Sequence, residues 1–211
     1  MKNKLAKIGI AASVLFLILL ATLHFIEPEF DPSINLISEY ELGKYGWMMS
    51  IAFFSLGVGV LSLVFSTWSY NKTKRGFIGR WLLLTISIAL FGAGIFYPYT
   101  TPNLASSIHT VCGLIVIFLF PIATTLYSSG LAQNHELKSS RNGLRLMSLL
   151  VWLGFLLFFG SLIFYHPVDV KDKVSLVVGL QNRFMMFTYS LWLIVLNYKI
   201  AFKVDRDLGK I

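Results

Sequence analysis

The stretch EPEFDPSINLISEYELGK, residues 27–44, is the polar segment that separates the first two apolar runs of the chain. It contains half of the ten acidic residues, namely Glu27, Glu29, Asp31, Glu39 and Glu41. Asp31 is a good N-cap, Pro32 a good first helical residue, and Gly43 a residue suited to a left-handed stop. The stretch therefore predicts a short helix over residues 32–42.

This predicted helix is amphipathic. With about 100° of rotation per residue, one side holds Ile34, Leu36, Ile37 and Tyr40, with the acidic Glu41 intruding, and the other holds Asn35, Ser38 and Glu39. We expect such a helix to lie at a membrane surface, with one face in the bilayer and the other toward water or a site.

The sequence on both sides of this stretch is too apolar for a soluble domain. Hydrophobic residues make up 56% of the chain and charged residues 13%, and the mean hydropathy is +0.71. The apolar residues come in runs of about 20, the length that crosses a bilayer. We predict one all-α domain over residues 1–211, an antiparallel bundle with membrane spans at about 6–26, 46–69, 81–97, 104–129, 146–165 and 184–202. The first run lacks a clear cleavage site, so we interpret it as a retained span.

The basic residues indicate the orientation. Fourteen of the 18 Lys and Arg residues fall on the side of the membrane that holds both termini, and the other four are Lys44, Lys171, Lys173 and Arg183. The positive-inside rule places the 14-residue side in the cytoplasm. The same bias explains the net charge of +8, so nucleic acid is not an expected partner.

The middle of every predicted span lacks Asp, Glu, Lys, Arg and His. This disfavours a pump or a proton-coupled transporter, because intramembrane proton relays use such groups. The single cysteine, Cys112, lies inside an apolar run, and no HExxH or similar ligand motif occurs. No helix carries two histidines at stacked positions for haem. The sequence therefore predicts no cofactor.

Three of the four histidines, His24, His109 and His166, fall in the predicted outer layer beside the outer carboxylates. His109 follows the predicted cap Asn103 by six residues, which places it roughly 7 Å below the start of its helix. An ionisable residue at that depth should face the bundle interior or a water-filled cavity. His109 is then either a functional residue or a partner in an interhelical hydrogen bond. For His24 and His166 the interpretation is a histidine at the membrane interface.

Arg183 lies on the outer side against the charge bias, so a specific partner should hold it. One interpretation is an ion pair with Glu39 or another outer carboxylate. The other is a lipid phosphate bound in the guanidinium fork.

Three groups of motifs resemble domain-of-unknown-function family 998. They are DPSINLISEYELGKYGWMM at 31–49, GAGIFYP at 92–98 with IHTVCG at 108–113, and GLQNRFMMFTYSLWL at 179–193. The family comprises six-span membrane proteins of bacteria and archaea, so the resemblance implies a prokaryotic cytoplasmic (inner) membrane, and it implies no established activity. Carried across, the family's polar positions are Ser38, Glu39, Gly43, Pro98, His109, Gln181 and Arg183. The sequence reads SEYELG where the family pattern is a shorter SELG, which leaves open whether Glu39 or Glu41 is the equivalent carboxylate.

The sequence is compatible with three hypotheses about function, which belong to different classes of protein. The leading hypothesis is a non-enzymatic protein with an outward-facing pocket for a lipid or small amphiphile, so that membrane lipids are its expected partners. The helix at 32–42 would form the lid, and the ligand contacts would be Arg183, Gln181, His109, Ser38 and Glu39. The rival is a membrane-embedded hydrolase or transferase. In it His109 would be the general base with Glu39 as its orienting carboxylate, or a metal would be held by His109, His24 and Glu39. A structural or assembly subunit is the third.

Overall fold

The computed structural model describes residues 2–99, 101–164 and 177–202, and within these ranges it contains helices and no strand. Six of the helices are long and apolar enough to cross a membrane, which confirms the predicted fold class. In chain order the elements are α1 (Lys2–Ile26), η1 (Ile37–Leu42), α2 (Gly46–Ser66), α3 (Lys74–Ile95), α4 (Leu104–Leu131), η2 (His135–Ser140), α5 (Arg141–Phe164) and α6 (Val178–Phe202). The two η elements are single 3₁₀ segments.

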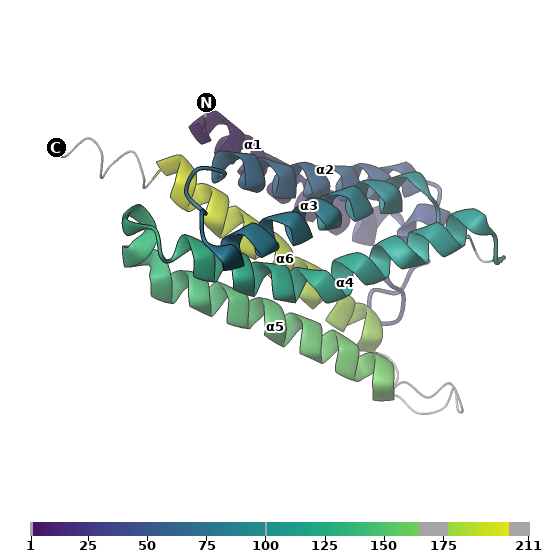
Figure 1. The fold of residues 1–211 in the computed structure, drawn as a ribbon. Helices are drawn as coiled ribbons and strands as arrows, with labels where there is room; N and C mark the ends of the chain where they lie inside the picture. Colours follow the sequence, from purple (N-terminus) through teal and green to yellow (C-terminus); the bar gives the residue numbers. More distant parts are fainter. Residues whose placement is uncertain (1, 100, 165–176, 203–211) are drawn as a thin grey trace.

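The six long helices form a closed ring (Figure 1). Each helix packs against the next along the chain, and α6 returns to pack against α1 and α2. The start of α1 and the end of α6 lie together with η2 at one end of the bundle, which we call the terminal end (Figure 1). The opposite end of the bundle carries residues 27–45. We call these residues the connection and this end of the bundle the connection end.

Helices α2 and α4 begin where their predicted spans do, but α1, α3, α5 and α6 begin earlier than expected, α1 at Lys2 instead of residue 6. The predicted starts at 81, 146 and 184 followed the first apolar residues, whereas the helices begin at Lys74, Arg141 and Val178. In α3 the reason is a cap, because the Thr73 hydroxyl accepts a hydrogen bond from the Gly76 amide at 3.0 Å. Polar helix starts of this kind are fixed by local hydrogen bonds rather than by hydropathy.

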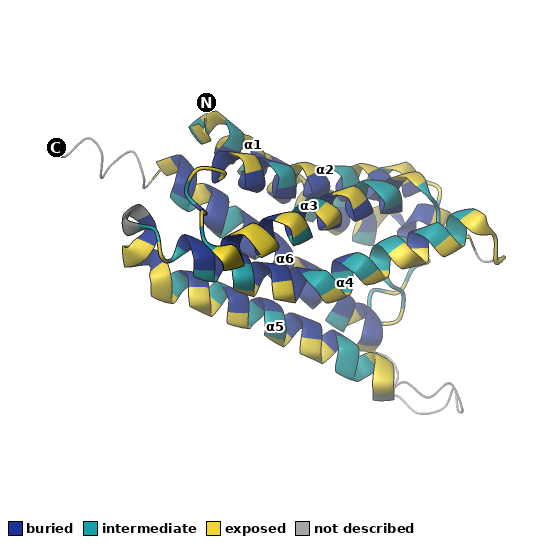
Figure 2. Cartoon of the chain, viewed as in Figure 1, coloured by how far each residue is buried: buried dark blue, intermediate teal, exposed yellow. Residues whose placement is uncertain are grey.

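The core lies along α2 and α6, whose inward faces are the most buried surfaces of the bundle (Figure 2). Phe120 of α4 stacks on Tyr189 of α6 with ring centroids 4.2 Å apart. The fully buried Trp192 donates to the Ser128 hydroxyl at 3.1 Å. By contrast, α5 exposes a row of leucines, including Leu146, Leu149 and Leu156, as a lipid-facing surface does.

Helices α3 and α4 touch backbone to backbone near the terminal end. A Cβ atom built on Gly79 would lie 2.7 Å from the Tyr127 backbone nitrogen. One built on Gly130 would lie 2.8 Å from the Gly76 Cα. Both distances are well inside van der Waals contact, so these glycines permit the close approach of the two helices.

The connection differs from the predicted helix over 32–42. Its helical part is the shorter η1, which starts after Leu36. Asp31 caps a turn instead of a helix, because its Oδ1 accepts from both the amide and the hydroxyl of Ser33 at 2.8 and 2.6 Å. The predicted left-handed stop at Gly43 is wrong, since its φ is −81°. A Cβ atom at Gly43 would instead meet the carboxylate of the buried Glu27, which would have to shift to make room.

The apolar face of the connection also points in a different direction from the one expected. Ile37, Tyr40 and Glu41 are buried, and η1 packs against α2 and α6. The buried face therefore covers the end of the bundle instead of entering the bilayer. Ile34, expected on the same face, remains 40% exposed because it lies in the turn before η1.

Candidate functional site

Arg183 fastens the connection to α1 and α6. Its Nη1 donates to the Asn35 carbonyl at 2.6 Å and to the Gly179 carbonyl at 3.0 Å, and its Nη2 donates to the Tyr40 hydroxyl at 3.1 Å. Its Nε donates to His24 Nε2 at 2.7 Å. All four partners are neutral, so within the described residues the expected ion pair with Glu39 is not formed. One guanidinium thus joins α1, the connection and α6.

His24 is oriented by this network. Its Nδ1 donates to the Leu20 carbonyl at 2.5 Å, which leaves Nε2 as the acceptor for Arg183. The ring is therefore neutral with the proton on Nδ1. A metal ion could use His24 only by displacing Arg183 from this lone pair.

Glu39, a predicted site residue on the connection, uses its carboxylate for hydrogen bonds within its own turn. Its carboxylate accepts from the Leu36 amide at 3.2 Å and from the Asn35 side-chain amide, which closes a capping box at the start of η1. Gln181 lies half-buried on α6 and does not line the cavity described below. Neither residue contacts His109 in the structure.

His109 is buried and bonded across to α3. Its Nδ1 donates to the Phe96 carbonyl at 2.7 Å and to the Ala93 carbonyl at 3.1 Å. The Nδ1 atom also lies 3.4 Å from Oε2 of Glu41. Because carbonyl groups only accept, the neutral ring carries its proton on Nδ1 and presents Nε2 as an acceptor. The carboxylate beside His109 is therefore Glu41 and not Glu39.

A small cavity lies between His109 and the connection. It has a volume of about 80 Å³. Three polar side chains line it, Ser38, His109 and Asn182, and the rest of its wall is glycine and apolar residues from η1 and from α2 to α6. Asn182 also fixes the roof, because its Oδ1 accepts from the Ile37 amide at 3.0 Å.

Asn182 is a site residue that sequence reasoning missed, and Glu41 was named there only as the alternative to Glu39. Glu41 did leave a signal, since it is the one acidic residue on the otherwise apolar side of the predicted helix. Its side chain is fully buried, and Oε1 accepts from the Ser50 hydroxyl at 2.9 Å while Oε2 has no hydrogen-bond partner among the described residues. Asn182 gave no signal, because an amide next to Arg183 is unremarkable at a helix start.

The predicted metal ligands do not converge. His24, His109 and Glu39 each bond to a different part of the structure. No group of three or more His, Cys, Asp or Glu side chains that could hold a metal ion occurs in the part of the chain that the structure describes. His166, the third histidine of the predicted outer layer, lies outside the described residues, as does Asp169, a predicted outer carboxylate near it in the sequence.

Burial gives Glu41 an unusual pH response. Desolvation raises the pKa of Glu41 from 4.5 to about 8, although the Ser50 hydrogen bond opposes the rise. The folded protein therefore holds a proton that the unfolded chain loses above pH 4.5. We expect the free energy of unfolding to fall as the pH rises from 4.5 to 8, by up to about 1.4 kcal/mol per pH unit, and to level off above that range.

Thermal unfolding in detergent at pH 5.5 and pH 8.5 measures this effect. Glu41→Gln keeps a neutral side chain of the same size, so its melting temperature should lose the part of the pH dependence that Glu41 causes. Equal pH dependence of the two proteins would contradict a neutral Glu41.

The fold and the buried polar connection define a polytopic, all-α membrane protein. Residues 10–198 match the family model described as "Protein of unknown function (DUF998)". The chain belongs to this family, which confirms the resemblance seen in its motifs. No curated protein and no solved structure matches the chain.

Proposed function

We propose that this protein is a non-enzymatic binding protein of the cytoplasmic (inner) membrane. It takes the apolar part of a lipid or small amphiphile into the cavity beneath the connection. The observation that supports this most directly is the cavity itself, an apolar space with three polar side chains at the bundle end. Sites for small amphiphiles combine a mostly apolar wall with a few placed polar groups.

The size of the cavity assigns a role to the connection. At about 80 Å³ it is smaller than the roughly 300 Å³ of a pocket for a drug-sized ligand. A lipid chain therefore enters only when the connection moves away from α6. Arg183 then acts as the fastener of a lid, and its hydrogen bonds to Asn35, Tyr40 and His24 are the contacts that opening must break. This replaces the role first expected for Arg183, the binding of a lipid head group.

Filling the cavity tests the proposal. A Cβ atom added to Gly113 meets nothing within 4 Å, and Gly113 lines the cavity. Gly113→Leu should therefore occupy the space without a backbone clash. Gly160→Leu is the matched control, because Gly160 also has open space around a Cβ atom and does not line the cavity.

Native mass spectrometry after incubation with a lysophosphatidylethanolamine provides the measurement. The wild-type protein and Gly160→Leu should keep one bound lipid at the same collision energy, and Gly113→Leu should lose it. Equal retention by all three proteins would place the lipid outside the cavity and contradict the proposal.

The orientation also belongs to this proposal. Eleven described Lys and Arg residues lie at the terminal end and two, Lys44 and Arg183, at the connection end. The positive-inside rule then puts the terminal end in the cytoplasm and the cavity near the outer leaflet. A fluorescent-protein fusion at the C-terminus should fluoresce and an alkaline phosphatase fusion should be inactive. The reverse pattern would invert the topology.

One observation favours the enzyme as a second candidate. His109 and Ser38 both line the cavity, and the carbonyls of Ala93 and Phe96 hold the Nδ1 proton of His109, which leaves Nε2 as the acceptor. A histidine whose Nε2 can accept a proton, lining the same cavity as a hydroxyl residue, is the pairing on which general-base catalysis depends. His109→Gln separates the two functions: an enzyme would yield cleaved lipid from the wild type and intact lipid from the variant, whereas a binding protein would return intact lipid from both.

A further inference from the structure

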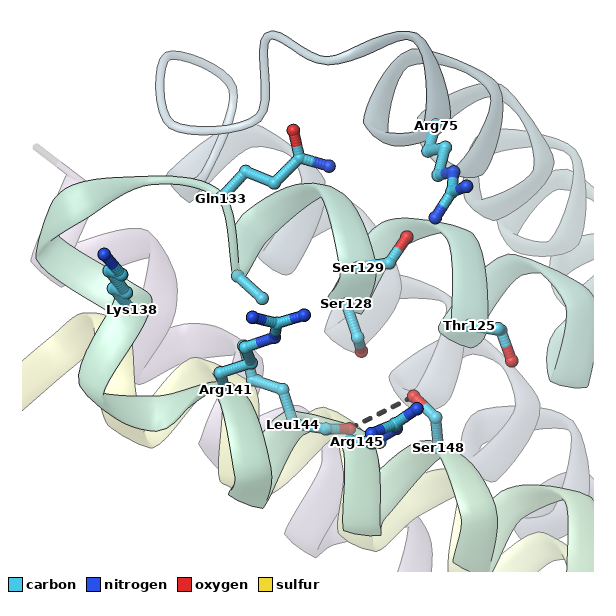
Figure 3. Close-up of a pocket in the computed structure, with 11 residues that line it drawn as sticks. Arg75, Thr125, Ser128, Ser129, Gln133, Lys138, Arg141, Leu144, Arg145 and Ser148 are labelled. Atoms are coloured by element: carbon cyan, nitrogen blue, oxygen red, sulfur yellow. Dashed lines mark hydrogen bonds between the residues drawn. The ribbon is translucent and has the colours of Figure 1, made fainter.

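A second and larger cavity lies at the terminal end, away from the site described above. Its volume is about 740 Å³, and it opens between the start of α3, the end of α4, η2 and the first turns of α5 (Figure 3). Four cations line it, namely Arg75, Lys138, Arg141 and Arg145, together with four hydroxyl side chains and the amide of Gln133. None of the lining residues is acidic.

No described residue holds the charged groups of these cations. In the described ranges the side chains of Arg75, Lys138, Arg141 and Arg145 make no hydrogen bond or ion pair with the protein. Arg80, one turn beyond Arg75, behaves differently: it donates to the carbonyls of Trp68 and Asn71 and stacks on the Trp68 ring. Among the described residues, Arg80 is therefore held by the bundle, whereas the side chains of the four cavity cations have no protein partner.

The hydroxyl groups of the cavity are held in fixed positions. Ser148 donates to the Leu144 carbonyl at 3.2 Å, and Ser129 donates to the Leu126 carbonyl at 2.9 Å. The buried Ser128 accepts from Trp192, and its own proton has no acceptor among the described residues. Figure 3 shows Arg75 and Arg141 reaching in from α3 and α5 on either side of these serines. Several cations and a spare hydroxyl proton around one space are the donor set that phosphate oxygens require.

We propose that this cavity binds the phosphate-bearing headgroup of an anionic phospholipid. The surface that leads away from it supports a lipid source for the phosphate. Ile122 of α4 and Leu149 and Leu153 of α5 are exposed beyond the cations, where the acyl chains would lie. Basic pockets between membrane helices on the cytoplasmic side hold such headgroups. This site is independent of the cavity under the connection.

The test removes charge inside the cavity or beside it. Arg75→Gln/Arg141→Gln takes two cations from the lining, and Lys72→Gln/Lys74→Gln takes two from the same bundle end outside the cavity. The proteins are placed in nanodiscs of phosphatidylcholine with a small fraction of phosphatidylglycerol, and bound lipid is quantified by native mass spectrometry. The cavity variant should lose about tenfold or more of its phosphatidylglycerol enrichment, because Arg75 and Arg141 would contact the headgroup phosphate directly and a charge-assisted hydrogen bond contributes roughly tenfold or more. The control should stay close to the wild type.

Two further experiments test the same proposal, one with a single substitution and one with a soluble phosphate compound. Ser129→Asp supplies a carboxylate to the cavity without removing any cation, and it should lower enrichment even if the double variant fails to fold. Titration with inorganic pyrophosphate in lipid-free detergent tests a soluble phosphate source. Three outcomes would each overturn the proposal: equal losses from the cavity variant and the control, no loss from either, or tight pyrophosphate binding by the lipid-free wild type that Arg75→Gln/Arg141→Gln abolishes.

Discussion

Arg183→Ala should release the connection from the bundle and lower the free energy of unfolding by about 3 kcal/mol. The estimate follows from hydrogen bonds to a charged donor, which contribute about 1.5–3 kcal/mol each and are not additive. The variant leaves the Asn35 carbonyl, the Tyr40 hydroxyl and His24 Nε2 without their donor. Hydrogen exchange measured by mass spectrometry should show faster exchange in residues 31–42, and thermal unfolding in detergent should show the loss of stability.

Two controls define what the result means. Arg183→Lys retains the charge but not the planar fork, so it should fall between the wild type and alanine. Lys44→Ala removes an exposed cation from the same bundle end and should change stability by less than about 0.5 kcal/mol. If Arg183→Ala exchanged no faster than Lys44→Ala in residues 31–42, the connection would not depend on Arg183.

Gly79→Ala should be as damaging, although it adds only one methyl group. The new Cβ atom would lie 2.7 Å from the backbone nitrogen of Tyr127, and a backbone atom cannot rotate away. Helices α3 and α4 must then separate, and overpacking of this kind costs about 1–3 kcal/mol. We expect a clear fall in melting temperature in detergent.

Gly160→Ala is the matched substitution. Both glycines lie inside a long helix, but a Cβ atom on Gly160 meets nothing within 4 Å. Alanine is the better helix former, so this variant should be unchanged or more stable by up to about 1 kcal/mol. Equal melting temperatures for the two alanine variants would mean that α3 and α4 are not packed as closely as the structure indicates.

Some features of this protein could be predicted from its sequence, and others required the structure. The six helices could be predicted from sequence, because a bilayer requires long apolar runs whose backbone groups bond within the helix. The cap at Asn103 could be predicted too, since capping depends on residues three apart: its side chain accepts from the Ser106 amide at 2.8 Å. The family was also visible in the motifs that surround His109 and Arg183.

The pairings at the candidate site could not be predicted, because they join residues far apart in the chain. Glu41 meets His109, and Arg183 meets His24, only after the ring of helices has closed. Glu39 was the more prominent candidate in the sequence, yet its carboxylate serves its own turn. Gly43 suggested a left-handed stop, whereas in the structure a Cβ atom there would meet the Glu27 carboxylate.

The sequence by itself thus determined the helices and the family, since hydropathy and caps act over a few neighbouring residues. The location of the two chain termini in the cytoplasm stays a prediction from the distribution of Lys and Arg residues. Only the tertiary structure decided which carboxylate lies beside His109, what holds Arg183, and which four cations line one cavity. The physical reason is that burial and long-range hydrogen bonding depend on which helices become neighbours, and no local pattern specifies that.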